Sequence, residues 1–158
     1  MQINTDMLAN VVRKYPNEIL LDAEDYEKYK LHMVFKFARG YVQIRHEGKM
    51  VYLHQLLTGF KFWKVDHKNG IPWDCRKDNL RGATTEDNSY NQGKQITNTS
   101  GYKGVSWCSR DKKWKAQITF NKVVKNLGRY DTPEKAHAAY IRAAKRFHGE
   151  FANFGLKE

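Results

Sequence analysis

The stretch Asp66-His67-Lys68-Asn69-Gly70, followed by Asn79 and Asn88, is the most informative part of this chain. It offers a carboxylate beside an imidazole, a glycine turn, and two later amide side chains. Carboxylate and amide oxygens can hold one divalent metal such as Mg²⁺ or Mn²⁺, and an imidazole can deprotonate a water. Asn-Gly is also an ordinary turn signal, so the rest of the chain has to indicate the substrate.

The residues around this stretch predict a strand, a long loop, a second strand and a helix. Glu86 and Asp87 would lie in the first turn of the helix, where the helix dipole favours acids, and Thr84 or Thr85 would cap it. The expected bounds are Trp63–Val65 for the first strand, 66–78 for the loop, Leu80–Ala83 for the second strand, and a helix end near Gln92.

Charge is distributed unevenly along the 158 residues, and the net charge is +11. Residues 31–158 hold 24 Lys and Arg against 11 Asp and Glu, whereas residues 1–30 hold 4 against 6. A basic surface of this size is typical of proteins that bind polyanions, although it is also compatible with solubility alone.

Cysteine usage and hydropathy exclude several classes of protein. The two cysteines, Cys75 and Cys108, form no Cys-x-x-Cys pair, so we expect no structural zinc site and no disulfide framework. No signal-peptide pattern and no run of 18 apolar residues is present. We therefore expect a cytoplasmic protein without a membrane span.

The remaining segments predict a mixed α+β protein. A hairpin bending at Arg39-Gly40, a strand at Met50–Leu53 and a short helix from His54 precede the opening stretch. After residue 100, three short strands are followed by a helix capped by Thr132, with an alanine-rich apolar stripe. The expected strands are Tyr102–Cys108, Trp114–Asn121 and Val123–Tyr130, and the helix would end at Gly149.

Several separated motifs resemble the HNH nuclease family, in its phage homing-endonuclease branch, over about residues 18–92. They are Tyr52–Leu57, Val65–Gly70, Asp78–Thr84 and Asn88–Asn91. The resemblance implies that His67 is the general base, that Asp66 and Asn88 bind one Mg²⁺ or Mn²⁺, and that Asn79 braces the loop by hydrogen bonding to backbone. His54 would support the site without binding metal, and Arg76 and Arg81 would contact phosphates.

Motifs after residue 100 resemble the plant ethylene-response-factor (APETALA-type, AP-two/ERF) DNA-binding domain. They are Ser100–Trp107, Trp114–Ile118, Leu127–Tyr130, Thr132–Ala136, Ala138–Tyr140 and Ala152–Phe154. The resemblance implies a three-stranded antiparallel sheet packed on one helix, with the sheet in the major groove of double-stranded DNA. The residues expected to face DNA are Lys103, Ser106, Arg110, Gln117, Thr119, Asn126 and Arg129.

The two resemblances together predict four parts and one activity. Residues 1–40 would be an accessory region, 41–92 the HNH ββα-metal module, 93–100 a linker and 101–158 the DNA-binding domain. We expect a monomeric, phage-encoded, site-specific endonuclease of the homing type in a bacterial host, nicking one strand per event. Two alternatives stay open: a DNA-binding regulator with an inactive nuclease module, and a non-specific or RNA-directed nuclease.

Overall fold

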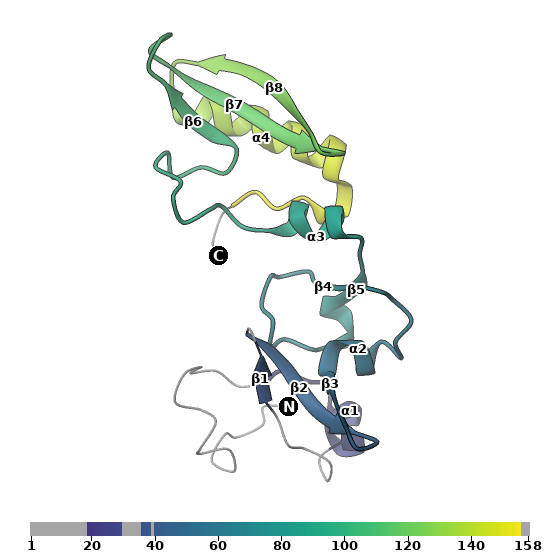
Figure 1. Ribbon diagram of the computed structural model, residues 1–158. Helices are drawn as coiled ribbons and strands as arrows, with labels where there is room; N and C mark the ends of the chain where they lie inside the picture. Colours follow the sequence, from purple (N-terminus) through teal and green to yellow (C-terminus); the bar gives the residue numbers. More distant parts are fainter. Residues whose placement is uncertain (1–18, 30–35, 39, 156–158) are drawn as a thin grey trace. The chain divides into compact units, whose positions relative to one another are not determined.

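The computed structural model describes residues 19–29, 36–38 and 40–155. The chain divides into two compact units between Thr84 and Thr85 (Figure 1). Small antiparallel sheets and short helices build both units, which confirms the α+β class. The division falls inside the 41–92 segment expected to be one nuclease module, so the helix of that module is part of the second unit.

The first unit contains a three-stranded antiparallel sheet in the order β1-β2-β3. Glu47 and Gly48 connect β2 to β3, and both have positive φ, as a tight two-residue hairpin turn requires. The predicted hairpin that bends before Tyr41 is the β1–β2 pair, and the predicted short helix from His54 corresponds to α2. The elements are α1 (Ala23–Tyr29), β1 (Lys36–Ala38), β2 (Tyr41–His46), β3 (Lys49–Tyr52) and α2 (Leu53–Leu57).

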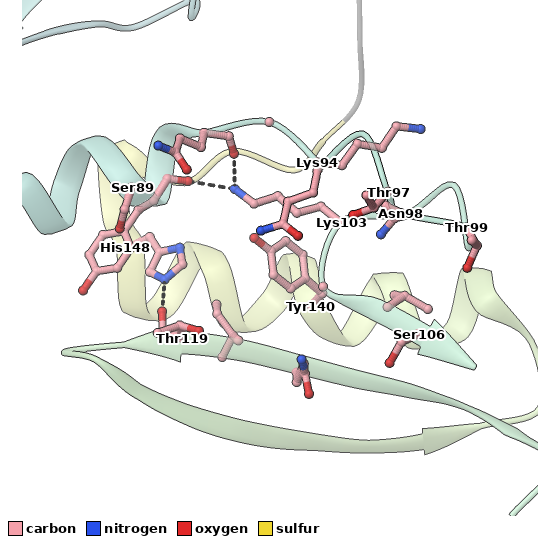
Figure 2. Close-up of a pocket in the computed structure, with 18 residues that line it drawn as sticks. Ser89, Lys94, Thr97, Asn98, Thr99, Lys103, Ser106, Thr119, Tyr140 and His148 are labelled. Carbon is pink, nitrogen blue, oxygen red and sulfur yellow. Dashed lines mark hydrogen bonds between the residues drawn. The ribbon is translucent and has the colours of Figure 1, made fainter. Parts of the chain in front are cut away.

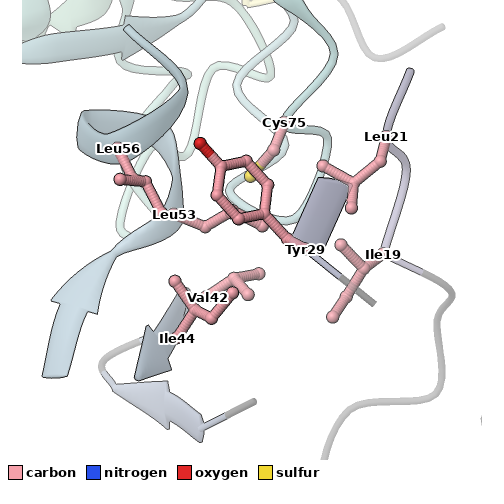
Figure 3. Packing of buried hydrophobic residues seen from close by; sticks show 8 residues of the cluster. All are labelled: Ile19, Leu21, Tyr29, Val42, Ile44, Leu53, Leu56 and Cys75. Carbon is pink, nitrogen blue, oxygen red and sulfur yellow. The ribbon is translucent and has the colours of Figure 1, made fainter. Parts of the chain in front are cut away.

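The core of the first unit lies between this sheet, α2 and the chain before α1 (Figure 3). Its fully buried members include Val42 and Ile44 on β2 and Leu53 on α2. Leu20 joins the core segment to the later loop, because its N–H donates to the Trp73 carbonyl at 3.1 Å and its carbonyl accepts from Cys75 N at 2.9 Å. The core therefore supports the loop that follows Asp66 and His67.

Asp66 and His67 lie on a two-stranded antiparallel sheet formed by β4 (Val65–His67) and β5 (Leu80–Gly82). The prediction that the first strand spans Trp63–Val65 was wrong, because pairing starts at Val65↔Gly82 and Trp63 is exposed. A 3-10 turn, η4 (Lys77–Asn79), leads into β5. Both candidate residues are thus inside the strand and buried, not in the loop after it.

The second unit contains a three-stranded antiparallel sheet in the order β6-β7-β8, covered by one long helix. Thr132 Oγ1 accepts from Lys135 N at 3.3 Å, which confirms the predicted cap. No helix of the described residues is long and apolar enough to cross a membrane. The elements are α3 (Thr85–Asn91), β6 (Val105–Cys108), β7 (Lys113–Phe120), β8 (Val123–Tyr130), α4 (Pro133–His148) and η5 (Gly149–Phe151).

Small side chains let α4 lie close against the sheet. Ala136, Ala139, Ala143 and Ala144 are buried on the helix, and they form two packed clusters with β6 and β7. The sheet contributes residues such as Val105, Ala116 and Ile118. Because alternate residues of a strand point to opposite faces, the neighbours of Ala116 and Ile118 are left on the other face.

The segment expected to be a linker, 93–100, has no helix or strand, but its side chains bind the start of the sheet domain. Asn98 Nδ2 donates to the Tyr102 carbonyl at 2.9 Å, and Ser100 Oγ donates to the Val105 carbonyl at 2.8 Å. Lys94 Nζ donates to the Gly101 carbonyl at 3.0 Å. These bonds fix the segment against the second unit.

Gly104 is a position where the second unit requires glycine. Its φ is +73°, and an added Cβ would lie 2.1 Å from Tyr140 Cδ2 and 2.8 Å from the Gln117 carbonyl oxygen. We expect Gly104→Ala to destabilise the second unit by about 2 kcal/mol or more, because left-handed strain adds to overpacking. Thermal unfolding measures the loss. Gly93→Ala is the matched control, because nothing lies near its added Cβ, and equal Tm values for both variants would contradict the prediction.

Candidate functional site

Asp66 is held by an arginine from the opposite strand. The register pairs Asp66 with Arg81, and Arg81 Nε and Nη2 donate to Asp66 Oδ2 at 2.9 and 2.7 Å. Both side chains are largely buried. Arg81, expected to contact phosphate, is therefore placed as the partner of Asp66 and orients its carboxylate.

Asn79 closes the loop between the two strands. Its Oδ1 accepts from Asn69 N at 3.0 Å, and its Nδ2 donates to the Asp74 carbonyl at 2.7 Å. Its own carbonyl accepts from Lys68 N at 2.9 Å. The buried amide thus bonds to backbone at two points of the loop, which is the geometry of a brace and not of a group that touches substrate.

Asp74 is a fully buried carboxylate in this loop that the sequence reasoning missed. Arg76 Nε and Nη2 donate to its two oxygens at 2.8 and 2.7 Å, and Asn69 Nδ2 donates at 2.8 Å. The hydrogen bond from Arg76 holds the pKa of Asp74 below its usual value. Arg76, also expected at DNA, instead carries this ion pair, although half of its side chain is exposed. The sequence did contain a signal for this buried carboxylate. Asp74 stands between the apolar residues Trp73 and Cys75 and two positions before the basic Arg76.

Two rings, those of His54 and Tyr41, lie against His67. The His54 ring lies 5.2 Å from the His67 ring, edge on, and Tyr41 lies 5.9 Å away. Tyr52 stacks on His54 at 5.4 Å. The structure thus puts His54 beside the candidate base, where the expected supporting role is possible. Tyr41, which sequence reasoning missed, contacts both histidines.

Burial keeps both histidines neutral. Burial, with a smaller contribution from nearby His67, lowers the pKa of His54 to about 4. Burial also lowers the pKa of His67, while Asp66 and Asp74 act in the opposite direction. A neutral imidazole can accept a proton from water at neutral pH.

Asn88 lies on α3, in the second unit. Its Oδ1 is buried and has no hydrogen-bond partner among the described residues. The helix is held to its own unit by Tyr90, whose ring stacks on His148 at 4.0 Å and whose hydroxyl accepts from Asn121 N at 3.1 Å. Asn153 Nδ2 also donates to the Asn91 carbonyl at 2.9 Å. The structure therefore gathers Asp66, His67 and Asn79 in one unit and places Asn88 in the other.

The sheet face opposite α4 carries most of the residues expected to contact DNA. Gln117 and Thr119 alternate with buried Ala116 and Ile118 on β7. Their cross-strand neighbours include Asn126, opposite Gln117. Ser106 and Arg129 both pair with Lys115, so they share this face. Arg110 lies in the exposed β6–β7 turn, and Arg110 and Arg129 both bind Asp111.

Lys103 does not belong to that face. Its Nζ donates to the Tyr90 carbonyl at 2.8 Å and to the Gln92 carbonyl, at the end of α3 (Figure 2). Burial lowers the pKa of Lys103 to about 8. It lines a cavity of about 540 Å³ within the second unit, together with Tyr140, His148 and polar residues of the 92–99 segment. Its two bonds make it a connector between α3 and the sheet domain.

Comparisons with known proteins agree with the order of these features. Residues 59–90 match the HNH endonuclease family, and residues 100–150 match the AP2 domain. Protein 3.8 of Escherichia phage T7 is 35% identical over 94 residues, which are 60% of this chain and 77% of that protein. The chain belongs to the same family as Protein 3.8. Its HNH endonuclease segment precedes an AP2 domain, which confirms the predicted fusion.

The HNH segment includes α3, although α3 packs in the same unit as the AP2 domain. No solved structure matches the chain. Among the described residues, no group of three or more His, Cys, Asp and Glu side chains could hold a metal ion.

Asn79 and Asn88 provide a matched pair for testing the brace. Asn79→Ala leaves Asn69 N–H and the Asp74 carbonyl without their partner, so we expect a loss of about 1–3 kcal/mol. Asn88→Ala removes no hydrogen bond that the structure shows to its Oδ1, so stability should change by less than about 0.5 kcal/mol. Urea unfolding and hydrogen exchange of residues 68–79 measure both. Equal protection of this loop in the two variants would refute the assignment.

The lowered pKa of His54 predicts a pH dependence of stability. In the unfolded chain His54 takes up a proton below its pKa of 6.5, whereas in the folded protein it stays neutral down to about pH 4. Its contribution is therefore complete above pH 6.5 and is lost as the pH falls toward 4, by up to about 1.4 kcal/mol per pH unit. Urea unfolding at several pH values should show a shallower dependence for His54→Gln. A parallel dependence in both proteins would show that His54 does not contribute.

Proposed function

We propose that this chain is a DNA endonuclease that hydrolyses a phosphodiester with His67 as general base. The observation that carries the proposal is the buried, neutral imidazole of His67 beside Asp66 on the β4–β5 pair, inside the segment that matches HNH endonucleases. The AP2 domain and the net charge of +11 support DNA as the substrate.

The types of donor atom at Asp66 and Asn88 suit one hard divalent cation. Asp66 offers a carboxylate oxygen. The buried Asn88 Oδ1 has no hydrogen-bond partner among the described residues, so its lone pairs are available to a metal ion. Carboxylate and amide oxygens suit Mg²⁺ or Mn²⁺, which keep several waters. When bound, such an ion would neutralise charge that develops on the phosphate and the leaving oxygen.

The chain's own residues have separable roles in this proposal. His67 accepts the proton of the water that attacks phosphorus, and the bond between phosphorus and the 3′ oxygen breaks. The leaving 3′ oxygen takes a proton from solvent, which gives a 5′-phosphate and a 3′-hydroxyl. Arg81 orients Asp66, Asn79 fixes the loop, and the rings of His54 and Tyr41 restrict the imidazole of His67. A fixed base at the reacting water supplies orientation as well as basicity.

The finer proposal concerns how the substrate is chosen and cut. The sheet face with Ser106, Gln117 and Thr119 would read a site in double-stranded DNA, while basic residues set its register on phosphates. A monomer with one such centre would nick one strand per event. We propose a phage-encoded homing-type enzyme acting in a bacterial host, consistent with the similarity to a phage protein.

A second candidate function is a DNA-binding regulator with an inactive nuclease module. One observation favours it: Arg81 donates two hydrogen bonds to Asp66 Oδ2, so one oxygen of the expected metal ligand already has a cationic partner. Incubation with supercoiled plasmid and Mg²⁺ separates the two candidates. Nicked circles support the nuclease, and specific binding without any cleavage supports the regulator.

Replacement of Asp66 or His67 tests the mechanism directly. We expect Asp66→Ala and His67→Ala to lower plasmid nicking by at least about 100-fold, since a general base contributes roughly 10²–10⁴-fold. Binding of DNA fragments should change little. Asp78→Ala is the matched control, because Asp78 is exposed in the same loop. Full activity of His67→Ala would refute its role, and activity in excess EDTA would refute the metal.

A further inference from the structure

An exposed aromatic loop, residues 58–64, immediately precedes β4. Trp63 is 92% exposed, and Phe60 and Phe62 are exposed as well. Tryptophan has a large apolar ring, and its exposure forgoes the stabilisation that burial provides. Clustered exposed aromatic side chains are typical of interaction surfaces.

The backbone of the aromatic loop is tied down at both ends. Gly59 N donates to the Leu56 carbonyl at 2.9 Å and Phe60 N donates to the Gln55 carbonyl at 2.9 Å, which joins the loop to α2. At its other end, Ala83 N donates to the Lys64 carbonyl at 3.1 Å. The exposed rings are therefore presented from a fixed base.

Phe62 anchors the loop to the β4–β5 pair. A Cβ built on Gly82 would lie only 2.3 Å from Phe62 Cδ1, so the Phe62 ring occupies the space that the absent side chain leaves. Trp63 follows directly and finds no such support, since almost all of its surface is accessible. The packing of Phe62 thus holds its neighbour in an outward position.

The charge of the aromatic loop favours a polyanion as its partner. Thr58-Gly-Phe-Lys-Phe-Trp-Lys64 contains two lysines and no acid, and Lys68 follows in the next loop. Lys61 Nζ lies 5.9 Å from the Phe62 ring centroid, so cation and aromatic ring are presented together. A second copy of the chain would bring like charges together at this surface, whereas a DNA backbone would neutralise them.

We propose that the aromatic loop binds duplex DNA, with Trp63 stacking on or inserting between bases and Lys61 contacting a phosphate. Trp63 and Asp66 are three residues apart, a chain length that spans at most about 10 Å. The base that Trp63 contacts would therefore lie within a few nucleotides of the phosphodiester presented to His67. Aromatic wedges of this kind unstack base steps and hold bent DNA. The proposal rests on the endonuclease function and makes Trp63 a substrate-positioning residue.

The test compares Trp63→Ala with Trp63→Phe in the full chain. We expect Trp63→Ala to lower the nicking rate of supercoiled plasmid at least tenfold, with changes in both kcat and KM, and Trp63→Phe to restore most of it. Stacking on aromatic side chains is sequence-tolerant, so the effect should appear on plasmids of different sequence. Because Trp63 is exposed, the Tm should not change. Ile96→Ala is the control, since Ile96 is fully exposed in the other unit.

A second measurement keeps this inference separate from the nuclease assignment. In the His67→Ala background, Trp63→Ala should weaken binding of a labelled duplex roughly tenfold by fluorescence anisotropy at fixed salt. If the unmodified chain fails to nick but this loss of affinity occurs, the endonuclease function fails and the DNA contact stands. Unchanged affinity and rate for Trp63→Ala would overturn the inference. So would a loss of self-association in sedimentation, or a loss of binding to anionic vesicles, without any effect on DNA.

Discussion

The buried carboxylate of Asp74 is the interaction on which the first unit depends. The carboxylate oxygens of Asp74 accept hydrogen bonds from Arg76 and Asn69, and its backbone carbonyl accepts one from the Asn79 side chain. Its backbone also pairs with Leu20, far away in the sequence. A buried charge is tolerated only when it is paired and hydrogen bonded. This single residue therefore couples the core segment, the loop and the strand pair that carries Asp66 and His67.

The second unit depends on a different interaction, the close packing of the alanine-rich helix α4 on the β6-β7-β8 sheet. That contact leaves one sheet face exposed, and it also orders the end of α4, where His148 stacks on Tyr90 of α3. The AP2 domain thereby contacts a helix that belongs to the HNH match. A nuclease element and a DNA-binding element share one packed unit, so their boundary in sequence is not a boundary in structure.

Much of the fold could be predicted because its signals are local. The Thr132 cap, the alanine stripe and the hairpin residues each act within a few positions. The misplaced strand at Trp63 shows the limit, since an aromatic β-former was read as a strand residue while pairing begins only at Val65. The two arginines show the same limit, because both were expected to contact phosphates. The loop instead brings Arg76 to Asp74. The cross-strand register brings Arg81 to Asp66.

The sequence by itself determined the basic character of the chain and, through its resemblance to two families, the order of the two modules. The roles of His67 as base and of Asp66 and Asn88 as ligands stay predictions of that resemblance. These follow from residues and motifs that are read along the chain without any knowledge of its folding. Only the tertiary structure decided that Lys103 binds the end of α3 and that His54 and Tyr41 enclose His67. It also decided that Trp63 is exposed while its neighbour Phe62 packs over Gly82. Each of these features depends on contacts between segments that are distant in the sequence. Such contacts form only in the folded chain, where burial of apolar surface and pairing of buried polar groups favour the same arrangement.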